Sequence, residues 1–358
     1  MKITRVDVVR VPLALTEPYT IAYETVDSAE NVFVRLVTDG PHVGLGCAGP
    51  DEGVTGETVD TCEAGIRAAA QRLVGEDPLR IARCLEAIQP LCVGAPAARA
   101  ACDMALHDLL GKAAGLPVYR LLGGYRSSIA TSITVYIGEP QAMAERARAF
   151  VSQGFTAIKL KGGRAVDEDL EALRLMRRAV GPGIGLRFDA NQGWDLKQTR
   201  RFIAGAEALD LELLEQPLPR GHGPGLATIT ADSTVPIMAD ESLIGLSDAF
   251  RLARGSVVNM INIKLMKVGG LDSALAVNAV ARAAGYDVMV GCMDESAIAI
   301  AAGLHFALAR PNVLLADLDG HLDLLNDPAA GAVILRDGVL YPSEEPGFGV
   351  KDLETVFA

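Results

Sequence analysis

Short runs of apolar and β-branched residues recur through the middle of the chain, and stretches with helical spacing separate them. The polar residues that close the second to the eighth of these runs follow one another at intervals of 23 to 30 residues, which is enough for one strand, one helix and two short loops. The eight runs span residues 131–137, 157–160, 185–188, 211–214, 237–239, 260–263, 288–290 and 313–315. Strands that alternate with helices predict a parallel sheet, and eight such units predict that the sheet closes into a (β/α) barrel.

The regions on either side of this repeat have a different pattern. Strand-like runs at 3–11 and 31–37 are followed by helical patterns near 55–74, 78–89 and 96–114. A Leu-Leu-Gly-Gly turn at 121–124 marks a boundary, and a hairpin-like segment around Asp337 and Gly338 follows the last barrel unit. We therefore predict an α/β protein with a modified TIM barrel over residues 126–330. An α+β capping domain is predicted over residues 1–125, completed by residues 331–358.

Composition and charge narrow the possible partners. The chain has 358 residues and a formal net charge of −12, so its surface repels phosphates and nucleic acid is not expected as a partner. No run of 18 apolar residues is present, and Asp7 and Arg10 interrupt the first apolar stretch as they would in a strand, so neither a membrane span nor a signal peptide is expected. The six cysteines form no CxxC pair and indicate free thiols in a reducing compartment. We expect a cytoplasmic homo-oligomer.

Carboxylates close three successive predicted strands, at Asp189, Glu215 and Asp240. Neighbouring strands lie about 4.8 Å apart, so three side chains at the carboxyl ends of adjacent strands can converge. Carboxylates this close raise each other's pKa unless a cation lies between them. Their hard oxygens suit Mg²⁺ or Mn²⁺ rather than zinc, and no histidine ends any of these strands. We predict a site for one Mg²⁺; an ion-pair network with nearby lysines is the alternative.

Lysines close the second and sixth predicted strands. Lys159 and Lys161 flank Leu160 and share one face of an extended strand, while Lys264 ends the strand roughly opposite in a ring of eight. A carboxylate substrate between them would present one face of its α-carbon to each lysine. A lysine is a poor base near neutral pH unless nearby positive charge lowers its pKa, and a bound metal would supply such charge. The alternative for Lys159 and Lys161 is a pair of surface lysines on an edge strand.

Several motifs around these residues resemble the muconate-lactonizing subgroup of the enolase superfamily along nearly the whole chain. They are AARAACDMALHDL at 97–109, IKLKGG at 158–163, FDANQGW at 188–194, LEQP at 214–217, MADES at 238–242 and INIKLMKVGG at 261–270. The resemblance implies that Asp189, Glu215 and Asp240 bind Mg²⁺. It also implies that Lys161 and Lys264 form the acid/base pair, with Lys159 as a supporting residue at the substrate.

The eighth predicted strand separates the activities of this subgroup. It ends at Asp317 and Asp319, which are two residues apart and can both face the barrel mouth. This Asp-x-Asp looks like the dipeptide-epimerase signature, in which it binds the free α-ammonium group of the substrate. Two anions there are costly unless a cation arrives. Thr134 matches a substrate-contact position of dipeptide epimerases, and a loop or helix-capping role for one aspartate is the alternative.

The resemblance therefore implies a dipeptide epimerase, an isomerase that moves a proton at the α-carbon of the C-terminal residue through an enediolate. Within the superfamily, the alternatives are an N-acylamino acid racemase, an o-succinylbenzoate synthase and a muconate cycloisomerase, whose substrates offer no α-ammonium group. From another class, the alternative is a Mg²⁺-binding structural protein on the same fold, against which the intact Lys161 and Lys264 argue.

Acidic residues also gather where the substrate side chains would lie. This chain resembles Ala-Glu epimerases over residues 18–26 but has Glu24 where they carry an arginine. Asp51, Glu52 and Asp294 add further negative charge. An acidic pocket favours a dipeptide with Lys or Arg side chains, whereas the alternative reading is the general surface acidity of a protein with net charge −12.

Overall fold

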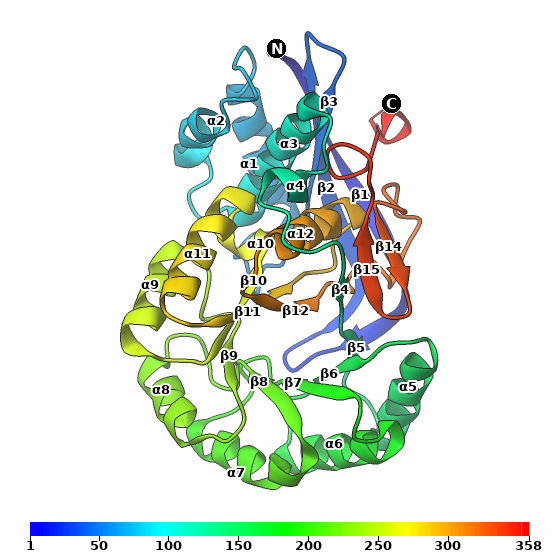
Figure 1. Cartoon of the computed structure of the whole chain (residues 1–358), viewed down its shortest axis with the longest axis vertical. Coiled ribbons are helices and arrows are strands. Elements are labelled where there is room, and N and C mark those ends of the chain that lie inside the picture. The colour runs from blue at the N-terminus through cyan, green and yellow to red at the C-terminus, as the bar shows by residue number, and fades with distance from the viewer. Residues whose placement is uncertain (352, 358) are drawn as a thin grey trace.

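The computed structural model describes residues 1–351 and 353–357. Figure 1 shows an antiparallel sheet with helices at the N-terminal end and, next to it, a set of parallel strands with helices on their outer side. Within the described residues, the parallel strands form one eight-stranded sheet in the order β12-β11-β10-β9-β8-β7-β6-β5. Because each strand neighbours its predecessor in the chain, the sheet curls round on itself. The predicted (β/α) barrel with an α+β cap is confirmed.

Each barrel strand lies within or next to one predicted apolar run. The strands are β5 (Ile133–Val135), β6 (Ala157–Lys161), β7 (Gly185–Asp189), β8 (Leu211–Glu215), β9 (Ile237–Ala239), β10 (Met260–Lys264), β11 (Asp287–Gly291) and β12 (Val313–Asp317). The first strand is shorter than predicted, because Thr131 and Ser132 bond to the last strand instead of the second. The Ser132 N–H donates to the Ala316 carbonyl at 3.0 Å, and this contact links the two ends of the sheet.

Helices cover the outside of the barrel. They are α5 (Pro140–Ser152), α6 (Val166–Val180), α7 (Leu196–Ala206), α8 (Gly223–Asp232), α9 (Leu246–Gly255), α10 (Leu265–Val268), α11 (Leu271–Ala283) and α12 (Ala297–Ala309), with a 3-10 turn η2 (Glu207–Leu209) after α7. Local sequence sets their ends. Asp195 and Gln198 form a capping box at the start of α7, in which each side chain accepts a backbone N–H of the other residue.

The cap is built on a second, antiparallel sheet in the order β13-β1-β2-β3. Its elements are β1 (Ile3–Thr20), β2 (Thr25–Thr38), β3 (Val43–Ala48), β13 (Leu324–Leu325), α1 (Val59–Arg72), α2 (Ile81–Ile88), η1 (Gln89–Leu91), α3 (Pro96–Ala114) and α4 (Val118–Leu121). Helix α3 begins with Pro96 and ends at Gly115, which has a positive φ of 68°, as the stop signals in the sequence predict. Strand β13 comes from the range predicted to be barrel and pairs with β1.

The hairpin of β1 and β2 is longer than predicted and reaches the barrel mouth (Figure 1). Its tip is held there by two contacts. The Thr20 carbonyl accepts from Ile137 N–H at 3.0 Å, and the Ala22 carbonyl accepts from the Arg164 guanidinium at 3.2 Å. The cap therefore places its residues 19–26 directly over the carboxyl ends of the barrel strands.

The C-terminal segment contains the predicted hairpin, β14 (Val333–Arg336) and β15 (Val339–Pro342), which pairs with β4 (Ile129–Ala130). Beyond it the chain runs to α3, where Phe348 N–H donates to Asp108 at 3.0 Å, and it ends near the 3-10 turn η3 (Glu354–Val356). Residues 352 and 358 of the predicted cap segment lie outside the described residues. The boundary at residue 125 and the assignment of 331–358 to the cap stay predictions.

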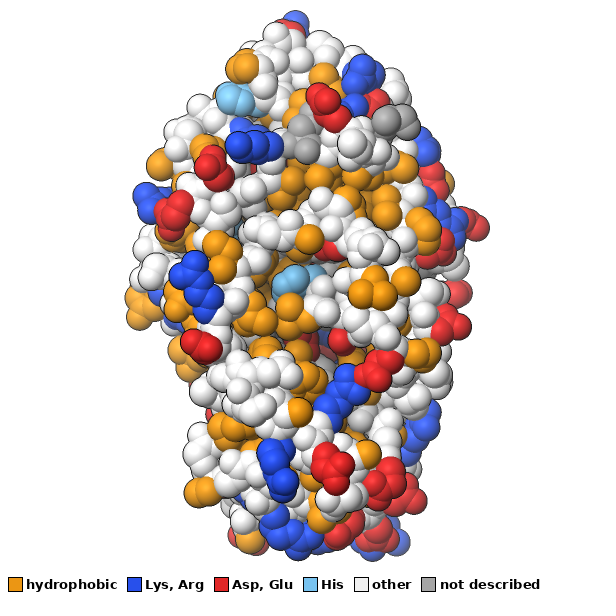
Figure 2. All heavy atoms as spheres, turned by 90° about the vertical axis from the view of Figure 1, so that its right-hand side faces the viewer, with side chains coloured by type: hydrophobic (Ala, Val, Ile, Leu, Met, Phe, Trp, Pro, Cys, Tyr) orange, Lys and Arg blue, Asp and Glu red, His pale blue; other side chains and the backbone are white. Residues whose placement is uncertain are grey.

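One face of the molecule shows how its charged side chains are distributed. On the face shown in Figure 2, acidic and basic side chains are interspersed among neutral and hydrophobic ones. None of the described helices is long and apolar enough to cross a bilayer.

Candidate active site

The predicted functional residues meet at the mouth of the barrel, under the cap hairpin. A cavity of about 310 Å³ lies there between the two domains. Ten predicted residues line it: Glu24, Asp51, Glu52, Thr134, Lys159, Lys161, Lys264, Asp294, Asp317 and Asp319. Asp189, Glu215 and Asp240 do not line the cavity themselves. They lie beneath it with no exposed surface, in contact with the lysines that do line it.

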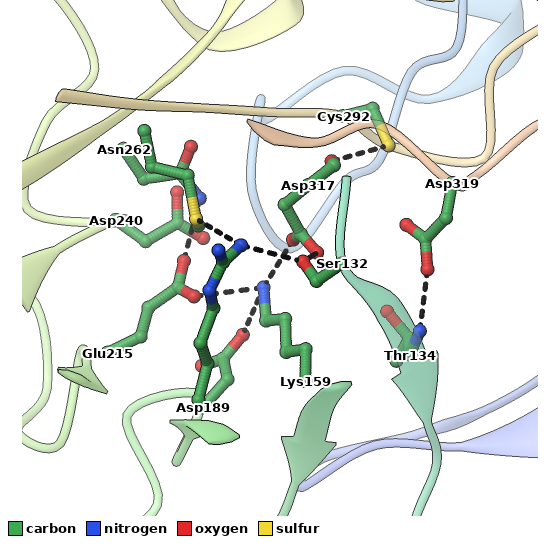
Figure 3. Close-up of polar contacts among 12 residues, drawn as sticks. Ser132, Thr134, Lys159, Asp189, Glu215, Asp240, Asn262, Cys292, Asp317 and Asp319 are labelled. Atoms are coloured by element: carbon green, nitrogen blue, oxygen red, sulfur yellow. Dashed lines mark hydrogen bonds and ion pairs between the residues drawn. The ribbon is translucent and has the colours of Figure 1, made fainter. Parts of the chain in front are cut away.

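Lys159 is the centre of this buried network (Figure 3). Its side chain is only 2% exposed, and its Nζ lies 2.8 Å from Asp317 Oδ2, 2.9 Å from Glu215 Oε2 and 3.1 Å from Asp189 Oδ2. Burial lowers the pKa of Lys159, but the three carboxylates outweigh burial and hold this pKa well above the ordinary value for lysine. Lys159 is therefore a permanent cation in this structure.

Lys161 and Lys264 lie on opposite sides of the site, because β6 and β10 are four positions apart in the eight-stranded order. Lys161 Nζ donates to Asp189 Oδ2 at 2.8 Å and to Asn191 Oδ1 at 3.1 Å. Lys264 Nζ lies 2.9 Å from Asp240 Oδ2. Burial lowers the pKa of Lys264, but Asp240 and other nearby carboxylates outweigh burial and raise it well above the ordinary value. The lowered pKa expected for a base is thus not produced by the protein groups alone.

The turn after Lys161 shows how the backbone makes room for this arrangement. Gly163 has a positive φ of 101°, and a Cβ atom at this position would lie 2.1 Å from the Ala190 carbonyl oxygen. Only glycine therefore allows the chain after β6 to pass so close to the end of β7. In the parallel register of β6 and β7, Lys161 pairs with Asp189.

The three carboxylates keep oxygens that suit a metal ion. Asp189 pairs with Glu215 in strand register, and Asp240 directly follows β9. Within the described residues, Glu215 Oε2 and Asp240 Oδ2 accept no hydrogen bond of good geometry, although a lysine Nζ lies 2.9 Å from each. Burial and the charge of Asp189 also raise the pKa of Glu215, which a cation would relieve.

This donor set consists of buried, anionic oxygens and fits Mg²⁺ in its chemistry. Lysine nitrogens rather than open space lie among the carboxylates in this structure. Accordingly, no three carboxylate, thiol or imidazole groups of residues 1–351 and 353–357 stand close enough to hold an ion between them as they are. Burial raises the pKa of Asp189 and Asp240, but the neighbouring lysines outweigh it and hold both pKa values below the ordinary value. The lowered pKa of each carboxylate favours the ionised form, which is the form that binds a cation.

Asp317 and Asp319 both reach the cavity, but their surroundings differ. Asp317 contacts Lys159 and Ser132, and these contacts outweigh burial and lower its pKa. Asp319 Oδ2 accepts the Thr134 backbone N–H at 2.7 Å, and the Thr134 side chain, which lines the cavity, also bonds to Asp319. Burial and the charge of Asp317 raise the pKa of Asp319. Asp317 is thus paired with Lys159, whereas Asp319 forms no ion pair within the described residues and its raised pKa favours the neutral form.

The remaining predicted acidic residues, Glu24, Asp51, Glu52 and Asp294, also line the cavity. Glu24, Asp51 and Glu52 line it from the cap, and burial followed by the charge of Asp51 raises the pKa of Glu24. Asp294 also lines it, but its Oδ2 is bonded to the Tyr19 hydroxyl, and burial raises its pKa to about 6. Asp294 thus connects the barrel to the cap in addition to adding charge.

Several residues of the site were not identified from the sequence. Glu241 lines the cavity next to Asp240, Asn262 donates to Glu215 Oε1 at 2.7 Å, and the fully buried Lys267 donates to the Asp240 carbonyl at 2.5 Å. Gln216 has a positive φ of 32° and accepts Asp240 N–H at 3.0 Å. All four lie inside motifs already singled out, where each is a polar residue within or next to an apolar run, and this was the available signal.

Two known protein families match separate parts of the chain. Residues 3–123 match the mandelate racemase/muconate lactonizing enzyme N-terminal domain, and residues 142–355 match the enolase C-terminal domain-like family. A hydrophobic dipeptide epimerase of Enterococcus faecalis and an L-Lys-D/L-Arg epimerase of Methylococcus capsulatus are each 39% identical over 98% of this chain and 99% of their own length.

The fold comparison agrees with the sequence comparison. The crystal structure of a dipeptide epimerase from Enterococcus faecalis, in complex with Mg and the dipeptide L-Leu-L-Tyr, superimposes with a TM-score of 0.96 at 39% identity. The match covers 98% of this chain and all of the other. The fold, the motifs at the strand ends and the two matched domains together show that this chain belongs to the mandelate racemase/muconate lactonizing enzyme family of the enolase superfamily.

Proposed function

We propose that this protein is a dipeptide epimerase that uses Mg²⁺ to invert the α-carbon of the C-terminal residue. One observation carries the proposal: Lys161 and Lys264 face the same cavity from opposite sides of the barrel, next to buried carboxylates, and Asp317 and Asp319 add two carboxyl groups to its wall, of which Asp317 alone forms an ion pair among the described residues. Such a cavity suits a ligand that carries both a carboxylate and an ammonium group. The epimerases among the similar proteins support the same reading.

The roles of the residues follow from their positions. One lysine, neutral, removes the α-proton from one face while the other, protonated, delivers a proton to the opposite face, so that the configuration inverts. We assign these roles to Lys161 and Lys264. Asp189, Glu215 and Asp240 would hold the metal. When bound, Mg²⁺ supplies positive charge that stabilises the enediolate form of the substrate carboxylate and favours the neutral form of the nearby lysines. Lys159 supports the site with its fixed charge.

Asp317 and Asp319 are assigned to the α-ammonium group of the N-terminal residue. A buried pair of carboxylates is costly unless cations compensate both charges. Of these two aspartates, only Asp317 forms an ion pair with Lys159 within the described residues. The substrate ammonium would supply the second cation. N-acylamino acids, succinylbenzoate precursors and muconate lack this group, and for this reason we place the other activities of the family behind a dipeptide epimerase.

The direct test is exchange of the α-proton with solvent. We expect the enzyme, incubated in D₂O with Mg²⁺ and a library of L,L-dipeptides, to incorporate one deuterium at the C-terminal residue and to produce the L,D epimer, as measured by mass spectrometry and chiral chromatography. N-succinylated amino acids should react at least about tenfold more slowly, since they lack the ammonium group. Exchange confined to N-acylamino acids would identify a racemase instead, and no exchange with any substrate would favour a structural protein.

We further propose that the enzyme prefers cationic dipeptides. Glu24, Asp51 and Glu52 line the cavity, where a carboxylate side chain would meet like charges. The similar epimerases act on hydrophobic dipeptides in one case and on Lys and Arg residues in the other, so they leave the preference open.

This preference gives a prediction. Partly screened charge pairs are worth roughly 1 kcal/mol each, so two or three of them favour Lys- or Arg-containing dipeptides over Ala-Glu by about 10- to 100-fold in kcat/KM. The preference should shrink with added salt and in a Glu24→Gln/Asp51→Asn variant, whereas Glu86→Gln, on exposed surface of α2, should leave it unchanged. If Ala-Glu proves the better substrate, these acids do not select the side chain, and the epimerase assignment still stands.

The cellular location and the partners of the protein are predicted from the sequence alone. The cytoplasmic location, the homo-oligomeric state and the absence of a nucleic-acid partner stay predictions.

A further inference from the structure

The two aspartates at the end of β12 are held in different ways. Asp319 is bonded by the backbone N–H and the side chain of Thr134, whereas the two oxygens of Asp317 are engaged by the side chains of Ser132 and Lys159. Lys159 Nζ donates to Asp317 Oδ2 at 2.8 Å, and the Ser132 hydroxyl donates to Asp317 Oδ1 at 2.6 Å (Figure 3). The position of Asp317 is therefore fixed before any substrate arrives.

The Ser132 hydroxyl is itself oriented by Arg187. The guanidinium of Arg187, on β7, donates through Nη1 to Ser132 Oγ at 3.1 Å and to the Ala316 carbonyl at 2.9 Å. A guanidinium can only donate, so the serine oxygen accepts from it and turns its single hydrogen towards other acceptors, of which Asp317 Oδ1 is the nearer. Ser132 is fully buried and Arg187 is 4% exposed, so water does not compete for these bonds.

Arg187 is anchored at its other end by Glu212 on β8. Arg187 Nε donates to Glu212 Oε2 at 2.9 Å. The carboxylate reaches this position because residue 185 is a glycine: a Cβ atom there would lie 2.4 Å from Glu212 Oε1. A continuous series of contacts thus runs from the exposed side chain of Glu212, through the buried Arg187 and Ser132, to Asp317.

This series of contacts opposes a displacement of the Asp317 carboxylate. Lys159 also contacts Asp189 and Glu215, so it draws Asp317 Oδ2 towards the buried carboxylates and away from the cavity. Ser132 holds the second oxygen in place. Without this bond Asp317 keeps its contact with Lys159 but loses the one that holds Oδ1, so the carboxylate can turn about the Oδ2 contact and the ammonium site loses a fixed wall.

We propose that Ser132 and Arg187 are positioning residues that hold Asp317 in place for the α-ammonium group of the dipeptide. The inference rests on the proposed function. Neither residue lines the cavity, so neither touches the substrate, and both act through Asp317.

The test compares two ligands that differ only in the ammonium group. Inhibition constants are measured for a slowly reacting dipeptide and for its desamino analogue, in which hydrogen replaces the α-ammonium. A hydrogen bond to a charged group is strong enough that Ser132→Ala and Arg187→Met should each weaken the dipeptide about 5- to 30-fold. The desamino analogue should change less than about twofold, and kcat less than about threefold, because Asp317 does not face the α-carbon chemistry. The conservative Ser132→Thr keeps a hydroxyl and should restore most of the dipeptide affinity.

Ser296→Ala is the matched control, because the buried Ser296 hydroxyl donates to Asp327 at the same distance of 2.6 Å, outside the cavity. It should leave the ratio of the two inhibition constants at the wild-type value. Equal losses for both ligands in Ser132→Ala and Arg187→Met would overturn the positioning role while leaving the epimerase intact. Wild-type protein that neither epimerises nor binds dipeptides would refute the proposed function instead. If Ser132→Ala does not fold, Arg187→Met decides alone, and a wild-type ratio in that variant overturns the proposal.

Discussion

Epimerisation should be lost when alanine replaces either Lys161 or Lys264. Each lysine serves one face of the α-carbon, so inversion needs both, and we expect kcat/KM for epimerisation to fall by about 10²- to 10⁴-fold in each single variant. The measurement is the rate of appearance of the second epimer by chiral chromatography. Because one lysine remains, each variant should still exchange the α-proton of one epimer with D₂O, and the two variants should retain exchange for opposite epimers.

The control is Lys197→Ala, which removes an exposed lysine at the start of α7 and should leave the rate unchanged. Unchanged epimerisation in Lys161→Ala or Lys264→Ala would rule out the two-base mechanism. Loss of exchange for both epimers in one variant alone would point to a single base that serves both faces.

Removal of the metal should abolish epimerisation, as replacement of either lysine should. After exhaustive treatment with EDTA we expect no measurable epimerisation, and addition of Mg²⁺ should restore it, because the buried carboxylates then have a cation that also stabilises the enediolate. Glu215→Gln keeps the size of the side chain and removes one negative charge. It should weaken Mg²⁺ binding at least about tenfold, as measured by isothermal titration calorimetry.

The lysines give this prediction a second readout. Lys159 now contacts Glu215 in the protein, so loss of that charge leaves Lys159 less balanced and should also lower the melting temperature of the metal-free form. Glu86→Gln serves as the control for loss of one surface carboxylate. Full activity after chelation, or unaltered Mg²⁺ affinity in Glu215→Gln, would mean that these carboxylates serve as an ion-pair network with the lysines.

Much of the architecture followed from the sequence because the barrel repeats one physical unit. Eight apolar runs at regular spacing give eight strands, and the residue that ends each run must lie at the carboxyl edge of the sheet. Lys161, Asp189 and Lys264 were placed at the site for this reason alone. The hydrophobic pattern predicts the strand end at which a side chain lies. It does not predict the side chains with which that residue forms hydrogen bonds or ion pairs.

The parts that could not be predicted depend on side-chain direction and on weak local signals. Lys159 contacts Asp317 as well as the predicted metal ligands, and Asp294 bonds to Tyr19 of the cap, because rotamers and domain packing set these contacts. The second half of β1 was missed because the polar residues Thr16 and Glu17 interrupt the alternation. Arg187 did carry a signal, as a charged residue in the middle of an apolar barrel strand, where burial requires a partner.

The two-residue strand β13 has a consequence for the order in which the protein folds. Leu324 of β13 pairs with Leu15 of β1, more than three hundred residues earlier in the chain. During synthesis on the ribosome, the N-terminal sheet emerges first but must wait for this strand until the whole barrel has been made. Joining such distant segments costs chain entropy that only an already compact barrel can reduce. We therefore expect β13 to pair with β1 late in folding. A prematurely terminated chain would carry both lysines and all three carboxylates and still lack this strand, which pairs with β1 of the β1–β2 hairpin.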